Sequence, residues 1–260
     1  MRLDIPEPTR LIQLLQPPAI MHLQKVFLLC LLIPGSASAA TSQITFWAYD
    51  QHAGGSPYYS HYQVTTADYE DSVGTVDLYD SGWGNMYPGN SAFHYMASIE
   101  ALYANTGISR SIGWHEYGME WDDSTMTISL SVDGNTLRTG TYTGIPAFFR
   151  FVFNGSGGVG QETVIDDFRY SINGTLIYQQ GFESGTLGAG WTVIRQDSGT
   201  HVSSGDTSTV HEGSGSLALG VSSPGGDAAI VVLDLASVPE PSVAVLGMLG
   251  LGLVARRRRC

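Results

Sequence analysis

The sequence is poor in cysteine, the residue whose disulfide bonds most often stabilise small exported domains. Only two cysteines occur, Cys30 in an N-terminal apolar run and Cys260 at the last position. The long stretch between them can therefore form neither a disulfide framework nor a thiolate metal site. A single well-packed core has to stabilise whatever fold this stretch adopts.

Positive charge is also scarce. Between Ala40 and Val238 there is no lysine, and the chain as a whole has a formal net charge of −12. A body with so few basic residues repels the phosphates of nucleic acids, so we expect no nucleic-acid partner. The basic residues of this stretch are Arg110, Arg138, Arg150, Arg169 and Arg195.

What the sequence does contain is typical of an all-β domain with many short strands. It has 32 glycines, 13 tyrosines and 5 tryptophans, and only 14% of its residues are charged. Period-two alternation predicts strands, and Asp133-Gly134 predicts a hairpin turn between two of them. A weak patch around residues 96–103 is the only helix signal in this body. The predicted strands cover residues 44–49, 125–132, 136–143, 148–153 and 163–171.

The N-terminus is typical of a secretory signal peptide, which we place at residues 1–39. Lys25 supplies the positive charge, residues 26–33 form a short apolar run, and a small-x-small cleavage site precedes Ala40. The site consists of Ala37, Ser38 and Ala39. Residues 1–20 contain Asp4, Glu7 and several prolines, which does not suit the start of a signal peptide, so Met21 is the better candidate for the true start.

The C-terminus combines a short apolar run with a cluster of arginines. A helix over residues 243–255 would cover roughly 20 Å, against about 30 Å of bilayer hydrocarbon. Such a helix is short for a permanent anchor, and the arginines would keep its end on the cytoplasmic side. We therefore expect a precursor that is exported across the inner membrane and held there transiently by a short transmembrane helix.

This tail, residues 237–260, resembles the PEP-CTERM sorting signal of Gram-negative bacteria that make extracellular polysaccharide. The resemblance implies recognition and processing by exosortase, a protease of the inner membrane, and a final location at the cell surface or outside the cell. Cys260 departs from the pattern, which usually ends on the basic run. The residues that carry the resemblance are Val238, Pro239, Glu240 and Pro241, followed by Arg256, Arg257, Arg258 and Arg259.

The body, residues 40–236, resembles concanavalin A-like jelly rolls, which include laminarinase-type glucanases and laminin-G-like modules. The pattern from Trp114 to Trp121, the later Val132-Asp133-Gly134, and the strand around Asp166-Asp167-Phe168 carry this resemblance. It implies a β-sandwich and says little about activity.

The order of these motifs is unusual. Residues 181–219 resemble the beginning of such a domain, yet they follow the strand around Asp166 that commonly closes one. We interpret the body as one circularly permuted sandwich, built from residues 40–173 and 176–236. Permutation is tolerated where the ends of a domain lie close together. A complete domain followed by a truncated second copy is the rival interpretation.

Catalysis is not expected from these residues. Glu116 and Glu120 lie on one predicted strand, but Gly118 stands where laminarinase-type glucanases have an aspartate, and the segment matches a non-catalytic strand of that family. In an extended strand the two glutamates are about 13 Å apart, farther than the roughly 5–9.5 Å of glycosidase carboxyl pairs. His115-Glu116 lacks the second histidine of a zinc protease.

Bound calcium is a further expectation, because jelly rolls often hold Ca²⁺ with carboxylates in loops. No other cofactor is indicated. The aspartates also fit ordinary turns that need no metal. The candidate ligands are Asp122, Asp123, Asp133, Asp166 and Asp167.

Glycan binding is the leading functional hypothesis. Two aromatic segments also contain glycine, serine or asparagine, a mixture that suits stacking on sugar rings and bonding to hydroxyls. We expect a non-catalytic surface or matrix protein that binds extracellular polysaccharide. A purely structural matrix protein and a divergent laminarinase-like hydrolase are the alternatives. The candidate contacts are Tyr58, Tyr59, Trp83, Asn85 and Tyr87.

Overall fold

The computed structural model describes residues 40–51, 58–67, 72–79, 94–100, 102–155, 159–223 and 228–238, and the statements below concern these ranges. Within them the chain forms fifteen β-strands and one short 3-10 helix, η1 (Leu235–Ser237). The all-β prediction is confirmed.

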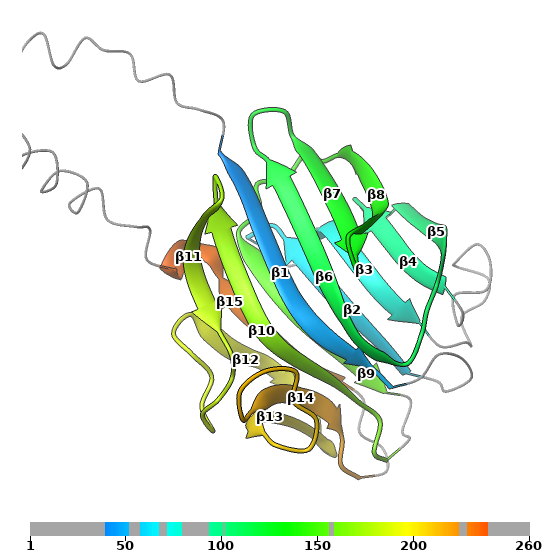
Figure 1. The fold of residues 1–260 in the computed structure, drawn as a ribbon, viewed down its shortest axis with the longest axis vertical. Helices are drawn as coiled ribbons and strands as arrows, with labels where there is room; N and C mark the ends of the chain where they lie inside the picture. The colour runs from blue at the N-terminus through cyan, green and yellow to red at the C-terminus, as the bar shows by residue number, and fades with distance from the viewer. Residues whose placement is uncertain are drawn as a thin grey trace, which may run out of the picture. The chain divides into compact units, whose positions relative to one another are not determined.

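The strands form two antiparallel sheets, one in front of the other in Figure 1. Both sheets mix strands from distant parts of the chain, as in a jelly-roll sandwich. Sheet A runs in the order β13 (Thr200–Asp206), β14 (Ser216–Val221), β10 (Glu162–Ile172), β1 (Thr41–Asp50), β6 (Gly113–Asp122), β7 (Thr127–Val132) and β8 (Asn135–Thr141), with β11 (Thr175–Gln180) also paired to β10. Sheet B runs in the order β12 (Trp191–Gln196), β15 (Ala228–Asp234), β9 (Phe148–Gly155), β2 (Tyr58–Thr65), β3 (Ser72–Tyr79), β4 (His94–Ile99) and β5 (Leu102–Ser109).

The strands of residues 176–236 extend both sheets and do not form a layer of their own. β14 pairs with β10 in sheet A, and β15 lies between β9 and β12 in sheet B. Trp191, from this later segment, stacks on Phe151 of β9 with ring centroids 5.5 Å apart. The two segments therefore share one core.

Two local predictions have opposite outcomes. The Asp133-Gly134 turn is confirmed: it joins β7 to β8, and both residues have positive φ, 48° and 72°. The helix signal at residues 96–103 is wrong, because β4 and β5 occupy this stretch and pair from Met96 to Leu102. Met96 and Ala97 are both fully buried in β4, on opposite faces of the strand, and this burial outweighs their weak helix preference.

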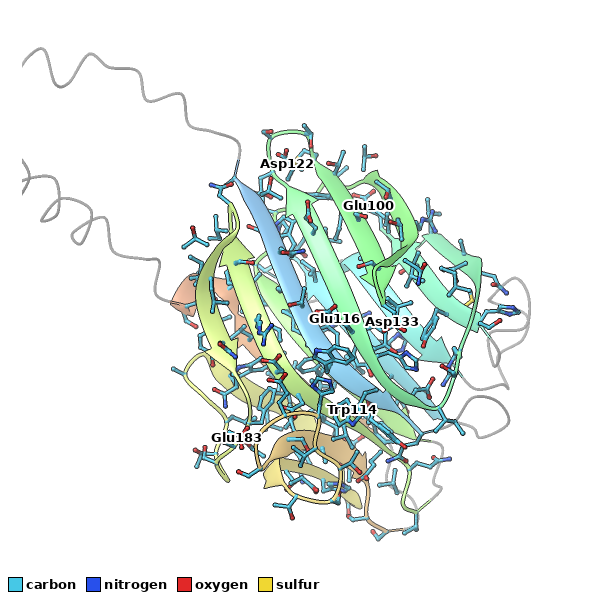
Figure 2. All side chains as sticks on the ribbon, in the orientation of Figure 1. Glu100, Trp114, Glu116, Asp122, Asp133 and Glu183 are labelled. Atoms are coloured by element: carbon cyan, nitrogen blue, oxygen red, sulfur yellow. The ribbon has the colours of Figure 1, made fainter. Side chains whose placement is uncertain are left out.

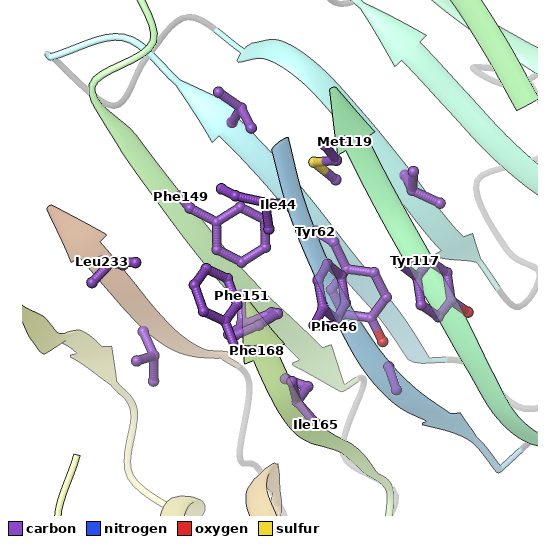
Figure 3. Close-up of a cluster of buried hydrophobic side chains, with 14 of the residues drawn as sticks. Ile44, Phe46, Tyr62, Tyr117, Met119, Phe149, Phe151, Ile165, Phe168 and Leu233 are labelled. Atoms are coloured by element: carbon purple, nitrogen blue, oxygen red, sulfur yellow. The ribbon is translucent and has the colours of Figure 1, made fainter. Parts of the chain in front are cut away.

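The core between the sheets is largely aromatic (Figure 3). Phe46 of β1 lies at its centre, with ring centroids 5.0–5.5 Å from four neighbours. Such ring pairs add specific packing energy to the burial of apolar area. The neighbours of Phe46 are Tyr62, Tyr117, Phe149 and Phe151.

The predicted signal peptide and the arginine-ended tail lie outside the described residues. Of their motif residues, only Ala40 and Val238 are described: Ala40 directly precedes β1, and Val238 is buried in the core after η1. In the described ranges, no helix has the length and apolar character needed to cross a bilayer.

Candidate functional site

In the described residues, the outward face of sheet A carries a group of aromatic side chains that lies outside the core. In β1, Ile44, Phe46 and Ala48 alternate inward and are fully buried, which turns Trp47 and Tyr49 to the outside. The same alternation in β6 buries every second residue from His115 and turns Trp114, Glu116, Gly118 and Glu120 outward.

The register between β1 and β6 brings these outward residues together. Trp47 pairs with Glu116, and Tyr49 pairs with Trp114. The rings of Tyr49 and Trp114 lie edge to face, with centroids 5.5 Å apart at 69°. Figure 2 shows Trp114 and Glu116 on the sheet that faces the viewer. All four side chains remain partly exposed.

A fourth ring arrives from the loop between β13 and β14. His211 stacks on Trp47 with ring centroids 4.0 Å apart at 14°, and its centroid lies 5.4 Å from that of Trp114. We call Trp47, Tyr49, Trp114 and His211 the aromatic platform. Within the described part of the chain, Nδ1 of His211 is buried without a hydrogen-bond partner.

Asp166 holds the His211 loop in place. Its Oδ2 accepts hydrogen bonds from the backbone amides of His211 and Glu212, both at 3.0 Å, and its Oδ1 accepts one from Asp167 at 2.7 Å. Asp166 is the β10 partner of Trp47 and is fully buried. Burial raises the pKa of its carboxyl group, and the three amides oppose this shift. Asp166 is thus a positioning residue for the platform.

The other proposed calcium ligands also have protein partners. Asp122 caps the turn after β6 by accepting from the amides of Ser124 and Thr125, and Asp123 accepts from the hydroxyl of Tyr142 at 2.7 Å. Asp167 pairs with Arg169 at 2.6 Å. In the described ranges no group of three or more histidine, cysteine, aspartate or glutamate residues could hold a metal ion.

Asp133, the remaining candidate, lies in the β7–β8 turn and bonds to β6. Its Oδ2 is 2.7 Å from Nδ1 of His115, and its Oδ1 accepts from the amide of Glu116 at 3.0 Å. Nε2 of His115 lies 2.9 Å from the carbonyl oxygen of Ser111. His115 and Asp133, which both belong to the jelly-roll-like pattern in the sequence, thus connect the β5–β6 loop and the β7–β8 turn to β6.

The predicted glycan contacts are not the residues of the platform. Trp83, Asn85 and Tyr87 lie outside the described residues, and Tyr58 and Tyr59 are described only as the backbone at the start of β2. The platform was missed because its strands are distant in sequence. The parity of Trp47 and Tyr49, opposite to that of Ile44, could have shown that both rings face outward.

Comparison with known proteins identifies no family. No family model matches the chain, and no curated protein matches it. Among solved structures, the catalytic domain of a GH131 β-glucanase from Podospora anserina matches with a TM-score of 0.23 and 10% identity. The match covers 77% of this chain and 58% of that one. A likeness at this TM-score carries no argument about function.

Proposed function

We propose that this protein is a non-catalytic glycan-binding component of the cell surface or extracellular matrix. The observation that carries the proposal is the aromatic platform, which consists of three partly exposed rings on the outward face of sheet A and the partly exposed ring of His211 from the β13–β14 loop. Aromatic faces suit the C–H faces of sugar rings, and the neighbouring Glu116 can accept hydrogen bonds from hydroxyls. Residues on sheet strands are held in place before a ligand arrives, which lowers the entropic cost of binding.

The non-catalytic part of the proposal rests on the positions of the carboxylates. Glu116 and Glu120 point outward from one extended strand, four residues and therefore about 13 Å apart. Glycosidases need two carboxyl groups at roughly 5–9.5 Å. Asp166 is the other acid beside Trp47, and its two side-chain oxygens already accept hydrogen bonds from three backbone amides.

We further propose that the chain reaches its location through the signal peptide and the PEP-CTERM-like tail. Export across the inner membrane, transient anchoring there and processing by exosortase would leave the sandwich at the surface. The position of Val238 supports this sequence of events, because this last described residue is buried in the core and the processing motif continues directly from it at Pro239. A protease acting there would find the motif next to the folded body.

The finer fold assignment is likewise a proposal: a concanavalin A-like sandwich with a circularly permuted strand order. The β10–β11 hairpin supports it. β10 carries the motif that commonly closes such domains, β11 precedes the motif that commonly opens them, and the two strands pair through a turn at Asn173 and Gly174.

The platform is tested by Trp47→Ala and Trp114→Ala in the full chain. Each change removes a stacking surface, so we expect glycan affinity to fall at least about tenfold, or ~1.4 kcal/mol. Binding is measured by affinity electrophoresis and calorimetry with polysaccharide from the native host and with a panel of soluble glycans. Thr139→Ala, on the outward face of β8, is the matched control and should bind normally.

Three results would contradict the proposal. Unchanged affinity in both tryptophan variants would show that the binding site lies elsewhere. Failure of the unaltered chain to bind any glycan would favour a purely structural matrix protein. Release of reducing sugar from a bound glycan would show an enzyme. Circular dichroism of each variant establishes that lost binding is not lost folding.

A further inference from the structure

We infer that the platform selects glycans that carry free amino groups. This inference rests on the proposed glycan-binding function and adds the class of ligand. It follows from the charges around the platform, which are acidic, and from the state of the arginines in the described residues, all of which have partners.

In the described residues, every arginine already donates to a protein acceptor, which limits what each can offer to an acidic sugar. Arg110 pairs with Asp50 at 2.8 Å in a fully buried ion pair, and Arg195 pairs with Asp197 at 2.6 Å. Arg169, which lies on the outward side of sheet A, pairs with Asp167 at 2.6 Å. The last two also have protein acceptors: Arg138 donates to the carbonyl oxygens of Ala97 and Leu102, and Arg150 donates to Gln63.

The acids beside the platform are, in contrast, available. Glu116 is the direct cross-strand neighbour of Trp47, and Glu212 follows His211 in the loop that covers Asp166. Within the described part of the chain, neither side-chain carboxylate takes part in a hydrogen bond or an ion pair. Side chains directly opposite each other on a sheet have Cβ atoms about 5 Å apart, so Glu116 reaches a ligand that contacts the part of Trp47 that His211 leaves exposed.

This combination of groups suits an ammonium ion. A cation over the face of tryptophan or tyrosine is attracted by the ring quadrupole, and a carboxylate at the edge adds a charge-assisted hydrogen bond. An amino sugar presents an apolar ring face and an ammonium group together, matching both. A sugar carboxylate would instead meet the carboxylates of Glu116 and Glu212 and be repelled by them, and the arginines of the described residues are already engaged by protein acceptors.

The experiment uses three oligosaccharides with the full chain in calorimetry at two salt concentrations. They are β-1,4-linked glucosamine hexamer, its fully N-acetylated form, and an oligouronate of similar length. We expect the glucosamine hexamer to bind at least tenfold more tightly than the acetylated one, with an advantage that shrinks at high salt. No binding of the oligouronate is expected.

Glu116→Gln and Glu120→Gln form a matched pair of variants. Both remove one negative charge from the same face of β6, but Glu120 lies opposite Gln43, about 13 Å from Glu116 and away from the platform. We expect Glu116→Gln to cut the preference for glucosamine several-fold and Glu120→Gln to preserve it. Equal effects of the two variants would overturn the assignment to the platform.

The outcomes separate the inference from the function on which it rests. Equal or tighter binding of the acetylated hexamer, or binding of the oligouronate, overturns the amino-group inference and leaves glycan binding in place. No binding of any of the three, nor of the wider glycan panel, overturns the proposed function and the inference with it.

Discussion

At the scale of single residues, the clearest agreement between sequence and structure is the turn at Asp133 and Gly134. Positive φ at both positions, 48° and 72°, is the type I′ geometry that suits the twist of a two-residue hairpin. Asn173 and Gly174 repeat it between β10 and β11, with φ of 52° and 72°. The dipeptide predicts the turn because the requirement is local.

Replacing Gly134 with alanine tests this requirement. An added Cβ would meet no atom within 4 Å, so the cost comes from the backbone alone. We expect a loss of about 1 kcal/mol in the free energy of unfolding, measured by urea denaturation. Gly134→Asn should lose less, because asparagine tolerates positive φ. Equal losses in the two variants would contradict the explanation.

The hydrogen bond between Asp133 and His115, unlike the turn, could not be predicted from local sequence. The two residues are 18 positions apart, and only the pairing of β6 with β7 brings them within 2.7 Å. The sequence shows both residues, but nothing local to either one shows that they meet. The same limit applies to the platform, where His211 reaches Trp47 from a loop far along the chain.

At the scale of elements, one contact joins two loops beside the platform. Glu183, in the connection from β11 to β12, accepts hydrogen bonds at Oε2 from the amide of Ser214 (2.7 Å) and from its hydroxyl (2.8 Å). These bonds lower the pKa of the Glu183 carboxyl group below its ordinary value of 4.5. Ser214 belongs to the loop that carries His211, so this contact helps to fix that loop.

The lowered pKa makes the contact sensitive to acid. Its stabilising effect is fully present above pH 4.5 and is lost as the pH falls through the folded-state value. We therefore expect Glu183→Gln to melt below the unaltered chain near neutral pH, with the difference closing in more acidic solution. Melting curves between pH 3 and pH 7 measure it.

Ser214→Ala is the control for this contact, because it removes the hydroxyl donor and keeps the amide. It should reproduce part of the same pH-dependent difference, and adding Glu183→Gln should remove the remainder, so that the double variant matches Glu183→Gln alone. A difference that stays constant across the pH range would show that Glu183 acts through something other than its charge.

Strand prediction succeeded where one face of a strand is buried. In β6 the alternation from Trp114 to Trp121 shows both the strand and its inward side. It failed at β4, where residues 95–99 are all buried and no alternation is left to read. Local patterns predicted the partner of β7 through its hairpin turn but not the partners of β1, because β1 pairs with β6 and β10 and with no strand next to it in sequence.

At the scale of the whole molecule, the later segment is essential to both sheets. β15 is an interior strand of sheet B, and Phe182 and Trp191 are buried in the shared core. Removing this segment would expose the long edges of β9 and β10 together with a large apolar surface. We therefore expect residues 40–238 to fold as one unit.

A chain that ends at Asn173 tests this unity. We expect it to be unfolded or aggregated, with no cooperative melting transition, and we expect co-expression with residues 174–238 to restore folding. Circular dichroism and proteolysis measure both results. A protease-resistant fragment of the full chain that ends near Ser171 would contradict the prediction and favour a domain followed by a partial copy.

The central position of β1 has a consequence for the order of events during synthesis. Thr41–Asp50 is made first among the strands, yet its two neighbours are complete only when Asp122 and Ile172 have been added. Sheet B can be completed only later, when Asp234, the last residue of β15, has been synthesised. Pairings between such distant segments form slowly. The growing chain therefore stays open until nearly all of it exists, and an open chain is the form that a narrow translocation channel can pass.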